Sequence, residues 1–311
     1  MSGGGSEAAR WVIGRCSTVG MQLARGVLAR RIGRRSGAPA TTAELDRTGL
    51  LVRRAVRIPV KWRDQEVIFP LYEDSLAHSF WRAQEFSLLR RHLPLLERPV
   101  LDFGCGDGSF AAVLFEKVDF GVDIDEDALA VAKEFGIYGE LLKSDGRRIE
   151  LPDGAVGSVF SNSVLEHVSN LNDALAEISR VLRPGGTFIL SVPVVRFARD
   201  LARYFGKGES DRVNSDYFHR NLMETEEWKR LLCANGLLPI TVQEYQPAWF
   251  SFYYMQLRYL GNQGLGRVFP GIRDWFWGRY QGRLVEMVRQ STASTEERGG
   301  NVFIVARKEA G

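Results

Sequence analysis

The sequence has few of the residues that build disulfide frameworks and metal clusters. Three cysteines and four histidines occur in 311 residues, and neither set shows the close spacing of a zinc motif. Cys16, Cys105 and Cys233 lie too far apart for a CxxC site, and their odd number argues against a disulfide scaffold. We therefore expect a protein of a reducing compartment that holds no metal.

Long apolar runs and a strong net charge are missing as well. No stretch is apolar enough to span a bilayer as a helix. The net charge of +3 is too small to predict a nucleic-acid partner. With 45% hydrophobic and 25% charged residues over 311 positions, the composition is that of a globular protein with a full core.

Acidic residues are absent between Glu7 and Glu44, and seven arginines fall in that gap. Apolar residues recur there at helical spacing, which predicts a basic amphipathic helix within residues 1–40. A hairpin and a helical cap are expected in residues 41–99. The basic helix fits an anionic membrane surface, although a mitochondrial transit peptide has the same composition. We expect a cytoplasmic protein with peripheral membrane contact, and a mitochondrial location is the alternative.

Strands and helices alternate from Val100 onward. Buried strands are expected at 99–103, 120–124, 138–145, 155–163, 187–193, 237–245 and 301–308. The helix before the fifth strand is expected to stop at Pro184 and Gly185. This pattern predicts a Rossmann-like α/β fold, with a seven-stranded, mostly parallel sheet and helices on both faces. The core would span 100–247 and close with a strand in 299–311.

A glycine-rich turn follows the first of these strands, in "VLDFGCGDG". Gly104, Gly106 and Gly108 alternate there, which lets a ligand lie on the backbone beside the positive N-terminus of the next helix. Dinucleotide sites use the spacing GxGxxG, and Ser109 stands where their third glycine would be. An NAD-dependent oxidoreductase is therefore disfavoured but stays an alternative.

Acidic residues stand at the ends of three expected strands. Asp102 precedes the glycines, Asp123 ends the second strand, and Asp145 follows the third. The carboxyl ends of parallel strands meet at one edge of an open α/β sheet, where ligands bind. Carboxylates there can face an ammonium group, hold two ribose hydroxyls, or accept from an adenine amino group. The pattern describes a ligand with an amino acid end, a ribose and an adenine, and no phosphate.

At these residues the sequence resembles the class I S-adenosylmethionine-dependent methyltransferases, over roughly residues 75–245 and again in the closing strand. Four segments are similar to that family's motifs and occur in its order: "VLDFGCGDG", "GVDID", "SDGRRIELPDGAVGSVFSNSVLEHV" and "RVLRPGGTFILSVP". The segment "HSFWRAQEF" is similar to a helix over the cofactor in bacterial members from polysaccharide and lipid biosynthesis. The resemblance implies S-adenosylmethionine as the cofactor and a small molecule as the methyl acceptor.

The resemblance also implies a place for each part of the cofactor. The residues expected along its methionine part are Asp102, Gly104, Gly106, Gly108, Ser161 and Asn162. Asp123 would hold the ribose, Ile124 would pack on the adenine, and Asp145 would read the adenine amino group. Arg82 would clamp the methionine carboxylate, and an unengaged position on the surface of its helix is the alternative.

Two histidines are candidates for the catalytic base. His167, in "LEHV", follows the fourth strand, and His219, in "DYFHRN", lies in the segment that covers the acceptor in this family. Imidazole titrates near neutral pH, and a general base contributes a factor of roughly 10²–10⁴ when the acceptor is a hydroxyl. Either histidine could instead bond a loop carbonyl and serve structure. Cys105 is expected to be a packing residue beneath the cofactor.

An aromatic insertion at 248–298 separates the last two expected strands, where a short hairpin would suffice. One interpretation is a packed helical cap; another is an apolar roof over the acceptor, or a face toward a membrane. We therefore expect methyl transfer to a hydroxyl on a lipid-linked, glycan or other hydrophobic small molecule. A non-enzymatic scaffold that binds a partner through its aromatic face, and methylation of protein or RNA, are the alternatives.

Overall fold

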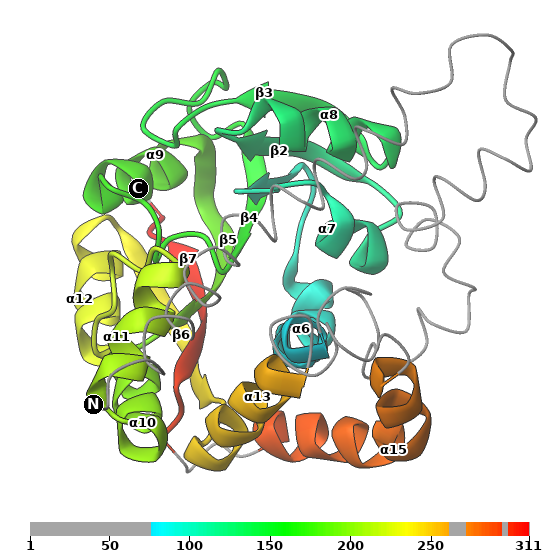
Figure 1. Cartoon of the computed structure of the whole chain (residues 1–311). Helices are drawn as coiled ribbons and strands as arrows, with labels where there is room; N and C mark the ends of the chain where they lie inside the picture. The colour runs from blue at the N-terminus through cyan, green and yellow to red at the C-terminus, as the bar shows by residue number, and fades with distance from the viewer. Residues whose placement is uncertain (1–75, 261–271, 294–297, 311) are drawn as a thin grey trace, which may run out of the picture.

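The computed structural model describes residues 76–260, 272–293 and 298–310 (Figure 1). The basic helix predicted within residues 1–40 and the hairpin after it lie outside the described residues. Helix α6 (Leu76–His92) opens the described part, and a 3₁₀ turn (Leu93–Leu95) leads from it toward the sheet.

Seven strands of the described residues form one sheet, in the order β3-β2-β1-β4-β5-β7-β6. They are β1 (Val100–Phe103), β2 (Val118–Asp123), β3 (Tyr138–Lys143), β4 (Val156–Asn162), β5 (Leu182–Pro193), β6 (Leu237–Tyr245) and β7 (Asn301–Lys308). Neighbouring strands among β1 to β5 pair in parallel, and β7 runs antiparallel to both β5 and β6. The predicted Rossmann-like, mostly parallel sheet is confirmed.

The strand order reverses between β1 and β4, and helices cover both faces of the sheet (Figure 1). On one face, α6 and α7 (Ser109–Leu114) share a core with the sheet through residues such as Leu88 and Ala112. On the other, α9 (Leu171–Val181) and α12 (Thr225–Ala234) pack through Ile178 and Trp228. Open α/β sheets bind ligands at the carboxyl edge of such a reversal, so the fold directs attention to the ends of β1 and β4.

The boundary between α9 and β5 differs from the prediction. The helix ends at Val181, before Pro184, and β5 already begins at Leu182. Leu182 pairs with Val156 of β4, and the register shifts after that pair. The helix cannot continue through Pro184, because proline has no amide hydrogen to donate. The pairing of Leu182 with Val156 ends the helix before the proline, since it places Leu182 in the sheet.

The chain between β6 and β7 contains α13 (Ala248–Leu260) and α15 (Ile272–Ala293), which pack against α6. Together with α10 (Val195–Phe205), which packs on α13, they form what we call the helical cover. Its core mixes aromatic and aliphatic side chains, and Phe80 of α6 stacks on Phe250 with ring centroids 3.8 Å apart. None of the described helices is long and apolar enough to cross a membrane.

Candidate functional site

The glycine loop between β1 and α7 has an open backbone surface. Gly104 and Gly106 have φ angles of +79° and +55°, which glycine adopts without strain. A side chain at Gly104 would meet Val164 at 2.4 Å, whereas nothing lies within 4 Å of the corresponding point at Gly106. The loop therefore packs tightly against the segment after β4 on one side and leaves room for a ligand at Gly106.

Asp123 closes this loop from the end of β2. One of its carboxylate oxygens accepts a hydrogen bond from the Gly106 amide at 2.7 Å, and the other accepts from the Asp125 amide at 2.9 Å. A carboxylate has about four acceptor positions, so both oxygens keep capacity for a ligand's hydroxyls. Beside it, the Ile124 side chain is 65% exposed and offers an apolar surface.

Asp102 is a buried carboxyl at the centre of the site. It is 5% exposed, and the Tyr138 hydroxyl donates a hydrogen bond to it at 2.7 Å. Burial raises the pKa of Asp102 to about 7; the hydrogen bond from Tyr138 opposes that rise, and the nearby Asp123 carboxylate adds to it. A positively charged ligand group placed here would stabilise the ionised form.

Asp145 follows β3, and the structure places it at the same edge of the sheet. The turn that carries it is tied to β2, because the Ser144 amide donates to the Asp123 carbonyl at 3.0 Å. The Asp145 carboxylate is exposed and accepts from the Arg147 side chain at 2.7 Å, which lowers its pKa. An adenine amino group would have to share this carboxylate with Arg147, so that role stays a prediction.

A buried carboxylate that the sequence did not single out connects α6 to the end of β4. Glu85 is fully buried and accepts from Trp81 Nε1 at 2.7 Å and from Arg82 Nη1 at 2.7 Å. It also accepts from Asn162 Nδ2 at 2.8 Å and from the Ser163 hydroxyl. Glu85 thus brings together two predicted site residues, Arg82 and Asn162, and fixes how both are oriented.

Arg82 therefore is not an unengaged surface residue. Besides the bond to Glu85, its Nε lies 3.2 Å from His78 Nε2, and its guanidinium lies over the Phe110 ring. Asn162 is held from its other side, where Ser191 Oγ donates to Asn162 Oδ1 at 2.6 Å. Next to it, the buried Ser161 hydroxyl has no hydrogen-bond partner among the residues that the structure describes.

Replacing Glu85 by glutamine should lower the free energy of unfolding by about 1–3 kcal/mol, because the amide keeps the shape but cannot accept from all four donors. Chemical denaturation of the purified protein measures this loss. Glu134, exposed on α8 (Glu126–Glu134), supplies the control: Glu134→Gln should change stability by less than about 0.5 kcal/mol. Equal stabilities of the two variants would contradict the role assigned to Glu85.

The two candidate histidines come together although they are far apart in the sequence. The rings of His167 and His219 lie 5.5 Å apart, and His167 Nε2 is 3.6 Å from an oxygen of Glu166. Burial lowers the pKa of His167, and it lowers that of His219 to about 3, so both imidazoles are neutral at pH 7. His219 also packs against Phe197 of the helical cover, so the pair lies where the sheet edge meets that cover.

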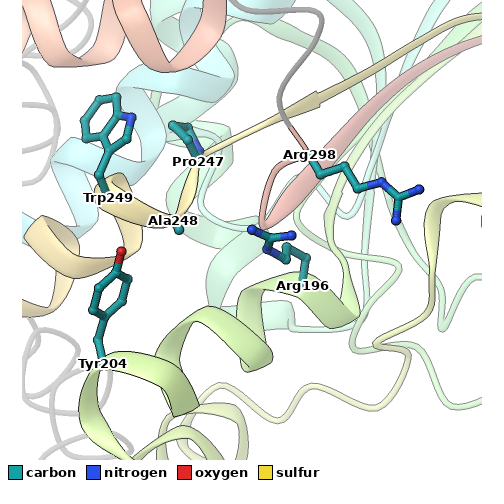
Figure 2. A pocket seen from close by; sticks show the side chains of 6 residues that line it. All are labelled: Arg196, Tyr204, Pro247, Ala248, Trp249 and Arg298. Carbon is teal, nitrogen blue, oxygen red and sulfur yellow. The ribbon is translucent and has the colours of Figure 1, made fainter.

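A pocket of about 410 Å³ opens where β6 passes into α13. Figure 2 shows Trp249 and Tyr204 on one side and the side chains of Arg196 and Arg298 on the other. Arg196 also donates to Asp200 at 2.9 Å. Guanidinium groups bind phosphates and carboxylates through paired hydrogen bonds, so this pocket suits an anionic group beside an apolar one.

Comparisons with known proteins point to methyltransferases. Residues 101–190 match the methyltransferase domain family. An uncharacterised methyltransferase of Mycobacterium tuberculosis is 31% identical over 141 residues, 43% of this chain and 72% of that protein. A malonyl-[acyl-carrier protein] O-methyltransferase of Yersinia pestis is 30% identical over 182 residues, 58% of this chain and 66% of that protein. Among solved structures, a candidate sarcosine dimethylglycine methyltransferase from Galdieria sulphuraria shares the fold, with a TM-score of 0.50 and 14% identity over 82% of this chain and 98% of that one.

Proposed function

Because this chain belongs to the class I S-adenosylmethionine-dependent methyltransferases, we propose that it transfers the cofactor's methyl group to a hydroxyl on a hydrophobic small molecule, lipid-linked or glycan. The observation that carries this proposal is the position of His167 and His219. His167 follows the carboxyl end of β4, the His219 ring lies beside it, and His219 packs against Phe197 in the core of the helical cover. The acceptor's hydroxyl would thus lie at the histidines, and its apolar part would lie on the adjacent helical cover.

The cofactor would lie across the ends of β1 and β2. Its ribose would bind Asp123, its adenine would pack on Ile124, and its ammonium group would face Asp102. The open surface at Gly106 leaves space for the methionine part, and the unpartnered Ser161 hydroxyl offers it a hydrogen bond. The bound cofactor supplies a methyl group on a sulfonium, which is an activated electrophile.

The protein's own part in the reaction is alignment and removal of a proton. The acceptor oxygen would form a bond to the methyl carbon while the sulfur–carbon bond breaks, and the sulfur leaves as a neutral thioether. The hydroxyl proton would pass to a neutral imidazole, either His167 or His219. Alignment can contribute about 7–11 kcal/mol to the lowering of the barrier, and the base a factor of roughly 10²–10⁴.

Two further observations support the choice of acceptor. In the pocket lined by Tyr204, Trp249, Arg196 and Arg298, the Arg196 guanidinium is directed toward the two rings and that of Arg298 points away from them (Figure 2). A cationic group beside aromatic rings suits the phosphate of a lipid-linked molecule. The Yersinia pestis relative, by its name, methylates an oxygen. Oxygen methylation of an acceptor with an apolar part is consistent with both.

The test is to incubate the protein with methyl-labelled S-adenosylmethionine and a cell extract, and then to separate organic, aqueous and macromolecular fractions. Label should enter the organic fraction, and Asp123→Ala should abolish most of that transfer while Asp107→Asn, exposed in the glycine loop, should keep it. Label that enters only the protein or RNA fraction would contradict the proposed acceptor class.

Cofactor affinity should fall as the pH falls through 7. Asp102 has a pKa of about 7 in the free protein because burial disfavours its charged form, whereas the cofactor's ammonium group favours ionised Asp102. Binding below pH 7 therefore requires a proton to leave, and the affinity should be about five- to tenfold weaker at pH 6 than at pH 7.5. Calorimetry at the two pH values measures the ratio. Asp102→Asn should bind more weakly and lose this dependence, and an unchanged dependence in that variant would contradict the assignment.

We propose that the basic N-terminal segment and the exposed aromatic residues bind to the surface of an anionic membrane. Trp275, Tyr253 and Tyr259 are 62%, 47% and 42% exposed, and each basic residue near an anionic surface contributes about 1 kcal/mol. The protein should sediment with anionic liposomes at low salt and be released at high salt. Deleting residues 1–37 should reduce this binding without changing cofactor affinity. Equal sedimentation with neutral and anionic liposomes, or none with either, would contradict it.

A further inference from the structure

The geometry points to a divalent-metal site formed by Glu166, His167 and His219. One ligand atom from each of the three side chains lies within 4.8 Å of the other two. His167 Nε2 and Glu166 Oε1 are 3.6 Å apart. In a tetrahedral zinc site with bonds of about 2.0–2.2 Å, neighbouring ligand atoms are about 3.4 Å apart, so a small closure would bring the three ligands onto one ion.

Hydrogen bonds set both imidazoles in the form that a metal requires. Asn214 Nδ2 donates to the Ser210 carbonyl at 2.9 Å, which turns Asn214 Oδ1 toward His219 Nδ1 at 2.8 Å. His219 Nδ1 must therefore carry the proton, and Nε2 keeps the lone pair. His167 Nδ1 faces the Phe218 carbonyl at 3.4 Å, which favours the same form. In histidines that ligate metals, the ring nitrogen that does not bind the metal typically donates to such an oxygen.

The backbone around the three residues holds them in place before any ion binds. The amides of Arg220 and Asn221 donate to the Glu166 carbonyl at 2.8 and 3.0 Å, so the loop with His219 is attached to the residue that supplies the carboxylate. Phe218 has a φ of +54°, a left-handed conformation that costs energy outside glycine. The residue directly before His219 is thus held in an uncommon conformation, which sets the direction of that imidazole.

Glu166 supplies a second, independent observation. Its side chain is 2% exposed, and its Oε2 has no hydrogen-bond partner among the described residues. Ionising a buried carboxyl group without a partner is costly, and a bound cation would stabilise its charged form. Burial raises the pKa of Glu166, and the charge of Arg82 opposes that rise only in part, since the ion pair of Arg82 is with Glu85 at 2.7 Å.

The ligand set indicates the kind of ion. Two imidazoles and one carboxylate are the protein ligands of catalytic zinc sites and of non-haem iron(II) sites, and both kinds of site keep positions open to water or substrate. A cavity of about 270 Å³ adjoins His219 and is lined by Asn214, Ser215, Phe218, His219 and Arg220. An acceptor oxygen could reach a bound ion from there. This inference rests on geometry and does not assume the proposed function. The two exclude each other at the imidazoles, because a nitrogen lone pair that binds an ion cannot also take the acceptor proton.

The test is to strip the full-length protein with a chelator and titrate it with Co²⁺ alone, in the absence of cofactor and acceptor, while the visible spectrum is recorded. One equivalent should give the intense bands of a four-coordinate cobalt site, and Zn²⁺ should displace it. His219→Gln should reduce the affinity at least tenfold, and Asn214→Ala, which leaves all three ligands, should reduce it about 10–100-fold.

The matched control is His92→Gln. His92 lies against Phe303, away from the three ligands, and its Nδ1 is bonded to the Leu88 carbonyl; the variant should bind cobalt as the unchanged protein does. Circular dichroism of each variant checks that it is folded. No saturable cobalt spectrum, or the same spectrum and affinity in folded His219→Gln, would overturn the proposal. Because only metal binding is measured, failure here would leave the methyl-transfer proposal untouched.

Discussion

Asp123→Ala is expected to weaken S-adenosylmethionine binding at least tenfold, and about a hundredfold or more if both ribose hydrogen bonds are lost. Hydrogen bonds to a charged acceptor contribute about 1.5–3 kcal/mol each, and every 1.4 kcal/mol is a factor of about ten in affinity. The carboxylate also accepts from the amides of Gly106 and Asp125, so its loss would loosen the glycine loop as well. Calorimetric titration with S-adenosylmethionine measures the change.

The control for Asp123→Ala is Asp107→Asn. Asp107 lies in the same loop, is exposed, and accepts from the amide and hydroxyl of Ser109. The asparagine keeps an acceptor there, so cofactor affinity should stay unchanged. An affinity of Asp123→Ala equal to that of the unchanged protein would show that the ribose lies elsewhere.

The second large effect is expected at the histidine pair. If an imidazole takes the acceptor proton, His167→Gln or His219→Gln should reduce kcat by about 10²–10⁴ and leave S-adenosylmethionine affinity nearly unchanged. Burial lowers the pKa of both imidazoles, so both keep a lone pair free at pH 7. The fall of the His219 pKa to about 3 makes it a weak base, so the larger loss is expected at His167. Single-turnover measurement of labelled methyl transfer separates this loss from slow product release.

The outcomes of the histidine variants differ in meaning. Loss of cofactor binding or of folding would assign that histidine to structure, as its bond to a loop oxygen allows. Full activity in both variants would contradict the assignment of either histidine as the catalytic base. It would point to an acceptor that is already ionised when it binds, such as a carboxylate. His92→Gln serves again as the control, because His92 lies outside the site.

The fold, and the position of Asp102 and Asp123 at the ends of their strands, could be predicted because the signals are local. Apolar strands that end in an acidic residue can be seen in the sequence, and parallel pairing brings those ends to one edge. Asp102 and Asp123 lie there, beside the open backbone of Gly106. The end of α9 was predicted too late, since pairing of Leu182 with Val156 depends on a strand distant in the sequence.

The rest of the site depends on contacts that no local pattern records. Glu85 binds Asn162 and Ser163, which are 77 and 78 positions away. The signal for it was the single acidic residue of α6, between Ala83 and Phe86 in a helix rich in apolar residues, where a charge is costly unless it is paired. The cluster of Glu166, His167 and His219 could not be predicted from spacing, because the loop conformation at Phe218 brings its members together.

The most direct test of the account is a crystal structure of the protein with S-adenosylhomocysteine, the demethylated cofactor. The account predicts ribose hydroxyls within hydrogen-bond distance of Asp123, adenine against Ile124, and the amino group beside Asp102, with the sulfur directed toward the segment that carries His167. A nucleoside bound elsewhere, or bound at this edge with its ribose away from Asp123, would contradict it.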